Sequence, residues 1–140
     1  MGANEQVVNE VLAAVAAADA PRAAQLYNSD AVMRMAGVPR AFGGVIEGRE
    51  AIVQDIAQRA PTTLDVRLVF GDQAHVCVVA KRSGTLASTQ TFRGNDEPFS
   101  TYECVVFRLE NGRVAEQTTY VNWLDAYVQT GMLDLAQLLG

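Results

Sequence analysis

Apolar residues in the first part of the chain are spaced in a way that predicts three helices. The first helix is predicted over residues 4–18, where apolar side chains recur every three or four positions, as on one face of an amphipathic helix. A second helix is predicted over residues 20–27, because Asp19 before it is a suitable N-cap. A third is predicted over residues 49–59 and ends before Pro61.

The apolar period changes to two after Pro61, which predicts β-strands. Four strands are expected in antiparallel succession, over residues 63–70, 74–82, 100–109 and 113–121. Asn111-Gly112 joins the last two, and this dipeptide is a strong signal for a two-residue hairpin turn. An earlier short strand is predicted over residues 30–35, followed by a glycine- and proline-rich loop over residues 37–48, and the chain ends in a short helical tail.

This order of elements predicts an α+β fold in a single domain over residues 1–140. Helices that are segregated to one face of a mostly antiparallel sheet are typical of this class. A strongly curved sheet wrapped around the N-terminal helices would form a cone, and the open end of a cone is a pocket. The chain has 140 residues, which suits one domain with one core, and it contains no internal repeat and no linker.

Composition and charge exclude several classes of partner. The net charge is −5 and the eleven Lys and Arg residues are scattered singly, so no basic stripe is available to bind nucleic acid. The longest apolar stretch, residues 11–18, is far shorter than the roughly 20 residues of a membrane span and lacks the basic flank of a signal peptide. We therefore expect a cytoplasmic protein with neither nucleic acid nor membrane as a partner.

Two cysteines and one histidine are too few for the usual metal sites. Cys77 and Cys104 both lie in apolar, strand-like runs, and we expect them to be buried, reduced and inert, the alternative being a nucleophile in a pocket. His75 has no second histidine to share a metal with. We expect no metal and no organic cofactor.

Three stretches resemble parts of the nuclear transport factor 2-like superfamily, and within it the SnoaL-like polyketide cyclase and ketosteroid isomerase-like group. "LYNSDAVMRM" is similar to the family's helix end, acidic residue and first strand, and "VIEGREAIVQDI" to its Gly-Arg-Glu-Ala-Ile helix start. "VVFRLENGRVAEQTTYVNWLDAYVQTG" is similar to its last hairpin and aromatic ending. The resemblance implies a single SnoaL-like domain with a cystatin-like α+β barrel, and a homodimer.

The same resemblance indicates which chemistries of the superfamily this sequence lacks. Where ketosteroid isomerases carry a tyrosine, a general-base aspartate and a protonated aspartate, the matching positions hold Val11, Met35 and Val105. Thr119 stands where limonene epoxide hydrolases and SnoaL place a key aspartate. The resemblance therefore does not carry over the steroid isomerase or epoxide hydrolase mechanism.

Glu103 and His75 are the candidate catalytic residues. Strand alternation places Glu103 on the same face as Val105, opposite the outward-facing Arg108, and a carboxylate on an apolar face suits general acid or base work. The alternative is that Glu103 lies in water or pairs with Arg82 or Arg93. His75 starts a strand after a turn, so it is either exposed or a base at the pocket rim.

Candidate ligand-binding residues are polar groups on the inner strand faces and apolar groups around them. Gln117 and Thr119 would orient and polarise a ligand oxygen. The alternative is that both side chains are satisfied by hydrogen bonds within the sheet. Trp123 lies where the last strand leaves the sheet, which suits a ligand wall or a subunit contact. The apolar candidates, which could equally be core, are Val11, Val15, Met33, Met35, Phe42 and Val105.

Two functions remain open at this point. The first is a cofactor-free enzyme, a cyclase, isomerase or dehydratase, that acts on a small apolar molecule of polyketide- or steroid-like character. The second is a non-catalytic ligand-binding protein or dimeric assembly module, which the missing family acids favour. Fold alone does not separate the two.

Overall fold

The structure, a computed structural model, describes residues 2–88 and 93–139, apart from the side chains of Phe42 and Leu138. Its elements follow the chain in this order: α1 (Ala3–Ala16), α2 (Ala20–Ala23), β1 (Tyr27–Ala36), the 3₁₀ helix η1 (Arg40–Phe42), β2 (Val45–Glu47), α3 (Arg49–Ala57), β3 (Thr63–Gly71), β4 (His75–Thr85), β5 (Pro98–Glu110), β6 (Arg113–Val121), α4 (Trp123–Gln129) and α5 (Leu135–Leu139). The α+β class that the sequence predicts is confirmed.

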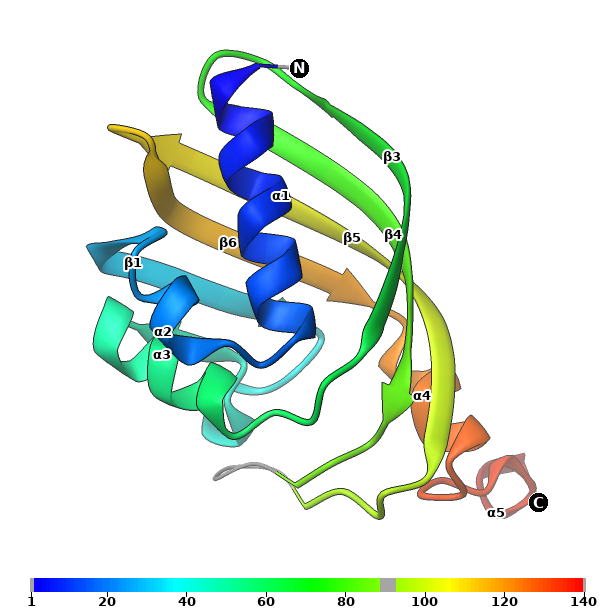
Figure 1. The fold of residues 1–140 in the computed structure, drawn as a ribbon. Coiled ribbons are helices and arrows are strands. Elements are labelled where there is room, and N and C mark those ends of the chain that lie inside the picture. Colours follow the sequence, from blue (N-terminus) through cyan, green and yellow to red (C-terminus); the bar gives the residue numbers. More distant parts are fainter. Residues whose placement is uncertain (1, 89–92, 140) are drawn as a thin grey trace.

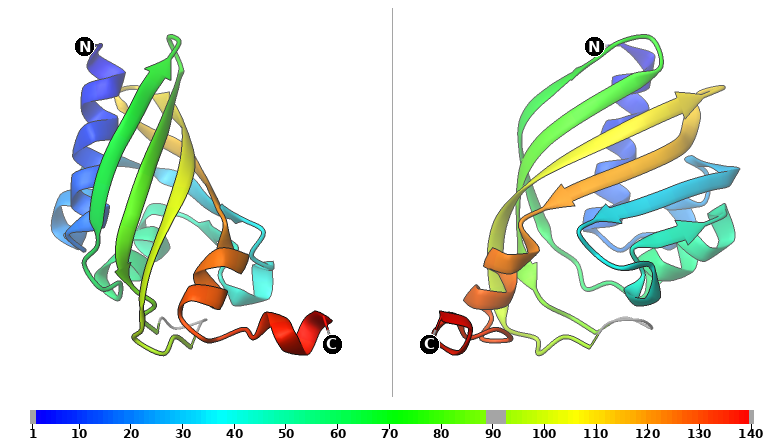
Figure 2. Two further views of the ribbon diagram at one scale, coloured as in Figure 1. Left: turned by 90° about the vertical axis from the view of Figure 1, so that its right-hand side faces the viewer. Right: turned by 180° about the vertical axis from the view of Figure 1, so that it is seen from behind.

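The strands form one six-stranded sheet in the order β2-β1-β6-β5-β4-β3. All neighbours are antiparallel except β1 and β6, which run parallel. Figures 1 and 2 show that the sheet is curved but not closed, with α1, α2 and α3 on its concave side. The last two helices, α4 and α5, follow β6 at one end of the sheet.

The core lies between the inner face of the sheet and the helices α1 and α3. The apolar stripe of α1 is buried, as its spacing predicts, and so are alternate residues of β4 and β5. Burying one such side chain fully contributes about 1.5–3 kcal/mol. The largest fully buried side chains include Val8, Val11, Ile52, Ile56, Val76, Val78 and Phe107.

The helices and strands predicted at residues 4–18, 49–59 and beyond residue 62 are confirmed, with ends that differ by a few residues. The second predicted helix is wrong in its second half, because the chain enters β1 at Tyr27. β1 is accordingly longer than the predicted strand, and the predicted loop contains the short strand β2. Pairing of β1 with β2 and β6 explains both differences, since partners distant in sequence override local propensity.

The hairpin between β5 and β6 turns at Asn111-Gly112, as predicted. Asn111 has a φ of 56° and Gly112 a φ of 75°, the left-handed values that a type I′ turn requires at both positions.

The two cysteines lie side by side on the outer, convex face of the sheet. Cys77 of β4 and Cys104 of β5 are both free and half-buried, and their sulfur atoms are 3.4 Å apart. Burial and the neighbouring Cys104 raise the pKa of the Cys77 thiol to about 11, so it is protonated near neutral pH.

Within residues 2–88 and 93–139, no helix combines the length and the apolar composition that crossing a membrane would require.

Candidate functional site

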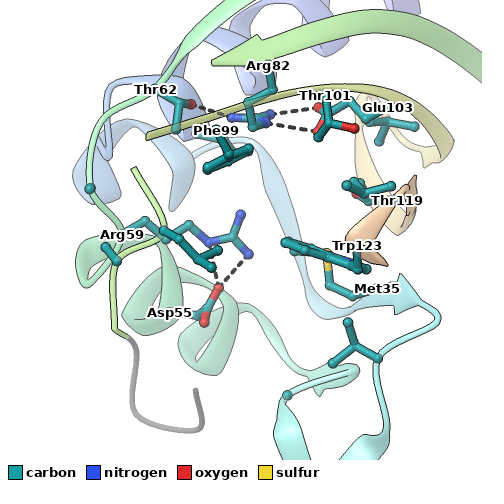
Figure 3. Close-up of a pocket in the computed structure, with 18 of the residues that line it drawn as sticks. Met35, Asp55, Arg59, Thr62, Arg82, Phe99, Thr101, Glu103, Thr119 and Trp123 are labelled. Atoms are coloured by element: carbon teal, nitrogen blue, oxygen red, sulfur yellow. Dashed lines mark hydrogen bonds and ion pairs between the residues drawn. The ribbon is translucent and has the colours of Figure 1, made fainter. Parts of the chain in front are cut away.

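A cavity of about 180 Å³ lies between the inner face of the sheet and residues of α1, α3 and α4 (Figure 3). It is larger than a cavity of about 150 Å³ that holds a benzene ring in an engineered protein. Most of its wall is apolar, and a few polar side chains interrupt it. These polar side chains include Asp55, Arg59, Thr62, Arg82, Thr101, Glu103, Gln117 and Thr119.

Glu103 and Arg82 form a buried ion pair in the cavity wall. Arg82 donates from Nε to Oε2 of Glu103 at 2.9 Å and from Nη2 to Oε1 at 2.8 Å. The Glu103 side chain is only 2% exposed. A charge buried to this extent is costly unless it is paired, and the two hydrogen bonds from Arg82 supply the pairing. Arg82 is fixed in turn by a hydrogen bond from Nη1 to Oγ1 of Thr62 at 2.5 Å. The inward orientation of Glu103 follows the predicted strand alternation, and the pairing with Arg82 is the alternative that the sequence left open.

Tyr27 orients the amide of Gln117. Tyr27 starts β1, is fully buried, and donates a hydrogen bond from its hydroxyl to Oε1 of Gln117. Burial raises the pKa of the Tyr27 phenol well above its usual value, so the hydroxyl keeps its proton and acts as the donor. Because Oε1 accepts this bond, the Nε2 donors of Gln117 remain for other partners, and Gln117 lines the cavity.

A second ion pair joins Asp55 in α3 to Arg59 just beyond the helix. Arg59 donates from Nε at 2.9 Å and from Nη2 at 2.6 Å, and both bonds end on the same oxygen, Oδ2 of Asp55. The Nη2 group also lies 3.5 Å from the sulfur of Met33. Both charged side chains are about four-fifths buried and line the cavity.

α4 supplies the aromatic part of the wall. Trp123 is the first residue of the helix, and its ring stacks on Tyr127 one turn later, with 6.0 Å between ring centroids. Asn122 caps the helix by accepting a hydrogen bond from the amide of Asp125. The indole Nε1 of Trp123 is buried and has no hydrogen-bond partner among the described residues.

The structure brings most of the predicted binding residues to this cavity. Val11 and Met33 are the exceptions: they are almost fully buried in the core and do not line it. The side chain of Phe42 lies outside the described part of the structure. The predicted residues that line the cavity together with Glu103 are Val15, Met35, Val105, Gln117, Thr119 and Trp123.

His75 is not brought to the cavity. It lies at the β3–β4 turn, where Asp72 accepts hydrogen bonds from the backbone amides of Ala74 and His75. The His75 side chain is 52% exposed and its Nδ1 lies 3.3 Å from Asp72. The turn fixes His75 at the surface, so the pocket-rim base considered from the sequence is corrected to an exposed turn residue.

Sequence reasoning did not single out Tyr27, Asp55, Arg59 or Phe99. The four-residue spacing of Asp55 and Arg59 is a signal for an ion pair on a helix, but it does not say which way the pair points. Tyr27 was missed because the sequence predicts a helix over residues 20–27, whereas Tyr27 starts β1.

Across the described ranges, no three His, Cys, Asp or Glu side chains come close enough together to hold a metal ion.

A family model described as a SnoaL-like domain matches residues 8–117 of the chain. A comparison with curated proteins finds no match. Solved structures share the fold at low sequence identity. A candidate SnoaL-like polyketide cyclase from Jannaschia sp. CCS1 is 14% identical, with 94% of each chain covered and a TM-score of 0.77.

Two further solved structures are similar over nearly their whole lengths. IdmH, a candidate polyketide cyclase from Streptomyces antibioticus, is 19% identical, with 91% of this chain and 98% of that chain covered and a TM-score of 0.70. An LEH-like epoxide hydrolase from M. tuberculosis is 15% identical, with 98% of this chain and 96% of that chain covered and a TM-score of 0.74. At these identities the likeness shows the fold alone.

The family match covers the strands that carry the buried ion pair and the Tyr27–Gln117 bond, and it ends before α4. The resemblance predicted from the three sequence stretches is therefore confirmed, and the chain belongs to the SnoaL-like domain family.

Proposed function

We propose that this protein is a cofactor-free enzyme that moves a proton on a small, apolar, polyketide- or steroid-like substrate, as a cyclase, isomerase or dehydratase does. The observation that carries the proposal is the Glu103 carboxylate, buried in the wall of a ligand-sized cavity and held there by Arg82. Each carboxylate oxygen has a further lone pair beyond the one that Arg82 occupies, so Glu103 can still accept a proton.

The chemistry follows from the groups that converge on the cavity. Glu103 takes a proton from a carbon next to a substrate carbonyl, and the electrons of that C–H bond form an enolate. Gln117, through Nε2, and Thr119, through its hydroxyl, donate hydrogen bonds to the enolate oxygen, where charge develops. The enolate then regains the proton at another carbon, or attacks a second carbonyl whose oxygen takes the proton from Glu103, or expels a hydroxyl group that takes this proton and leaves as water. These three outcomes are isomerisation, cyclisation and dehydration.

A specific observation favours the second candidate function, a ligand-binding protein without turnover. The positions that resemble the catalytic acids of the superfamily hold Met35, Val105 and Thr119, and all three line the cavity. Such a protein would bind the same apolar ligands but would not exchange their protons.

The test is deuterium exchange into a bicyclic enone, methyl octalone, in deuterated water, followed by NMR. We expect the protein to accelerate exchange at the acidic C–H positions, and Glu103→Gln to reduce the acceleration by about 100-fold or more, the usual contribution of a general base. Glu103→Asp keeps the charge opposite Arg82 and should also slow exchange, because it withdraws the carboxylate. Glu116→Gln, on the outer face of β6, is the matched control.

Binding of methyl octalone without accelerated exchange would favour the ligand-binding function. Exchange at the wild-type rate in Glu103→Gln would remove Glu103 from the proposal. Circular dichroism of each variant shows whether the fold is retained.

A further inference from the structure

We infer that Arg59 is a second ligand anchor, which donates a hydrogen bond to a neutral carbonyl oxygen of the ligand at the end remote from the reacting carbon. This inference deepens the proposed function and rests on it for the position of the reacting carbon. It assigns to the ligand a second oxygen function besides the one held by Gln117 and Thr119.

The first argument is the unused edge of the Arg59 guanidinium. Asp55 receives the bonds from Nε and Nη2, and Met33 contacts Nη2. No described residue accepts a hydrogen bond from Nη1, although the side chain is only 21% exposed. Nη1 is not among the fully buried atoms, so water can reach it in the free protein and a ligand oxygen can take the place of that water.

The second argument is the direction of the side chain. Figure 3 shows that Arg59 extends from its wall into the space bounded by Arg82, Phe99 and Trp123, while Asp55 lies on the side away from Arg82. The guanidinium is therefore presented to whatever fills the cavity. Glu103 lies across this space from Arg59 (Figure 3), so the two groups would engage different ends of one ligand.

The third argument is the charge of the cavity wall, which selects a neutral acceptor. The two arginines and the two carboxylates of the ion pairs cancel in formal charge. An anionic ligand would bring an uncompensated charge into a largely apolar space that already holds Asp55 and Glu103. A carbonyl oxygen adds no charge and still gains a hydrogen bond from a charged donor, which is stronger than a neutral one.

The surrounding side chains select the rest of the ligand. Phe99 and Trp123 offer aromatic faces, and Met35 and Val105 offer apolar contact. Together with the cavity volume of about 180 Å³, they fit a compact ring compound of one or two rings. The ligand class is thus a small cyclic diketone or a ketone of comparable spacing.

The test compares two probes that differ in one carbonyl. The first is methyl octalone, and the second is the corresponding bicyclic enedione, which carries an additional ketone on its second ring. Trp123 is the single tryptophan of the sequence and lines the cavity, so its fluorescence reports binding of either probe. We expect the wild-type protein to bind the enedione about tenfold more tightly than the octalone, as one hydrogen bond to a charged group allows.

Arg59→Met should abolish this preference, so that the variant binds the enedione and the octalone with equal affinity. The double variant Asp55→Asn with Arg59→Met removes the partner charge as well, and it should show the same loss if the single variant folds poorly. Arg22→Met, which breaks the exposed ion pair with Glu10, is the control and should keep the preference.

Equal affinity of the wild-type protein for both probes, no binding of the enedione, or a preference that survives in both Arg59 variants would each overturn the inference. If an octalone carboxylate binds more tightly than the enedione, and Arg59→Met loses this affinity, then Arg59 binds an anion. That result would overturn the inference that its partner is a neutral carbonyl. The two proposals can fail separately. If Arg59→Met loses the enedione preference while Glu103→Gln exchanges deuterium at the wild-type rate, the anchor is retained and the proposed base is rejected. The reverse pattern rejects the anchor and retains the base.

Discussion

Tyr27 is the buried residue whose single polar contact orders part of the candidate site. Its hydroxyl is bonded only to Gln117 among the described residues, across 90 positions of sequence. The bond decides which end of the amide faces the cavity, because an amide is otherwise free to turn over.

Tyr27→Phe should destabilise the protein by about 1–3 kcal/mol, since it leaves the buried Oε1 of Gln117 without a donor. The measurement is urea unfolding followed by circular dichroism. The same variant should slow octalone exchange, because Gln117 no longer presents Nε2 reliably. Tyr102→Phe, on the outer face and remote from the cavity, should leave the octalone exchange unchanged. A loss below about 0.5 kcal/mol would show that the bond contributes little.

Individual residues were predictable from sequence where strand alternation decides their direction. Glu103, Gln117 and Thr119 are buried on the inner face, as the period of two requires. Arg59 and Tyr27 were not predictable in this way, because one lies beyond a helix end and the other at a strand start. Their place in the site depends on which elements meet, and local spacing carries no information about that.

α4 is the element that turns the end of the sheet into one wall of the cavity. Gln129 fastens it to β5: its Oε1 accepts a hydrogen bond from the amide of Ser100, and its Nε2 donates to the carbonyl of Ser100, both at 2.8 Å. Nε2 also lies 2.7 Å from Oδ2 of Asp125. Gln129 thereby helps to hold the helix that carries Trp123, together with Asn95, whose Nδ2 donates a hydrogen bond to the carbonyl of Thr130 at 2.7 Å.

Gln129→Ala should loosen α4 and expose Trp123 to water. We expect the fluorescence maximum of Trp123 to shift to longer wavelength, acrylamide to quench it more strongly, and the octalone affinity to fall several-fold. Gln137→Ala in α5 is a matched change outside this contact. An unchanged spectrum in Gln129→Ala would show that α4 is held in place without Gln129.

Among the helices and strands, the long periodic segments were predictable from the sequence and the short paired ones were not. The stripe of α1 and the alternation of β4, β5 and β6 specify their own structure. β2 has only three residues and exists because β1 offers it an edge. The glycine- and proline-rich sequence around it, residues 37–48, predicts a loop.

The outer face of the sheet carries large apolar residues that no described helix covers. Leu68, Phe70, Tyr102 and Tyr120 are each more than half exposed on this convex face. An apolar face of this kind is unusual for a monomer. We propose that it is the contact of a homodimer, as the family resemblance implies.

Size-exclusion chromatography with light scattering should give twice the monomer mass of 15.1 kDa. Tyr102→Glu should shift the protein towards the monomer, because it places a charge at the centre of the apolar face. Leu139→Glu changes an equally apolar residue of the C-terminal helix and should leave the mass unchanged. A monomeric wild-type protein at high concentration would contradict the proposal.

The parallel pairing of β1 with β6 has a consequence for synthesis on the ribosome. β1 precedes its long partner β6, which begins at Arg113, so until β6 has been made β1 can pair only with the three residues of β2. The nascent chain must therefore hold an unsatisfied, partly apolar strand until β6 has been made. We expect a stalled chain that ends before β6 to bind chaperones, and the finished protein to acquire its hollow interior in one late, cooperative event.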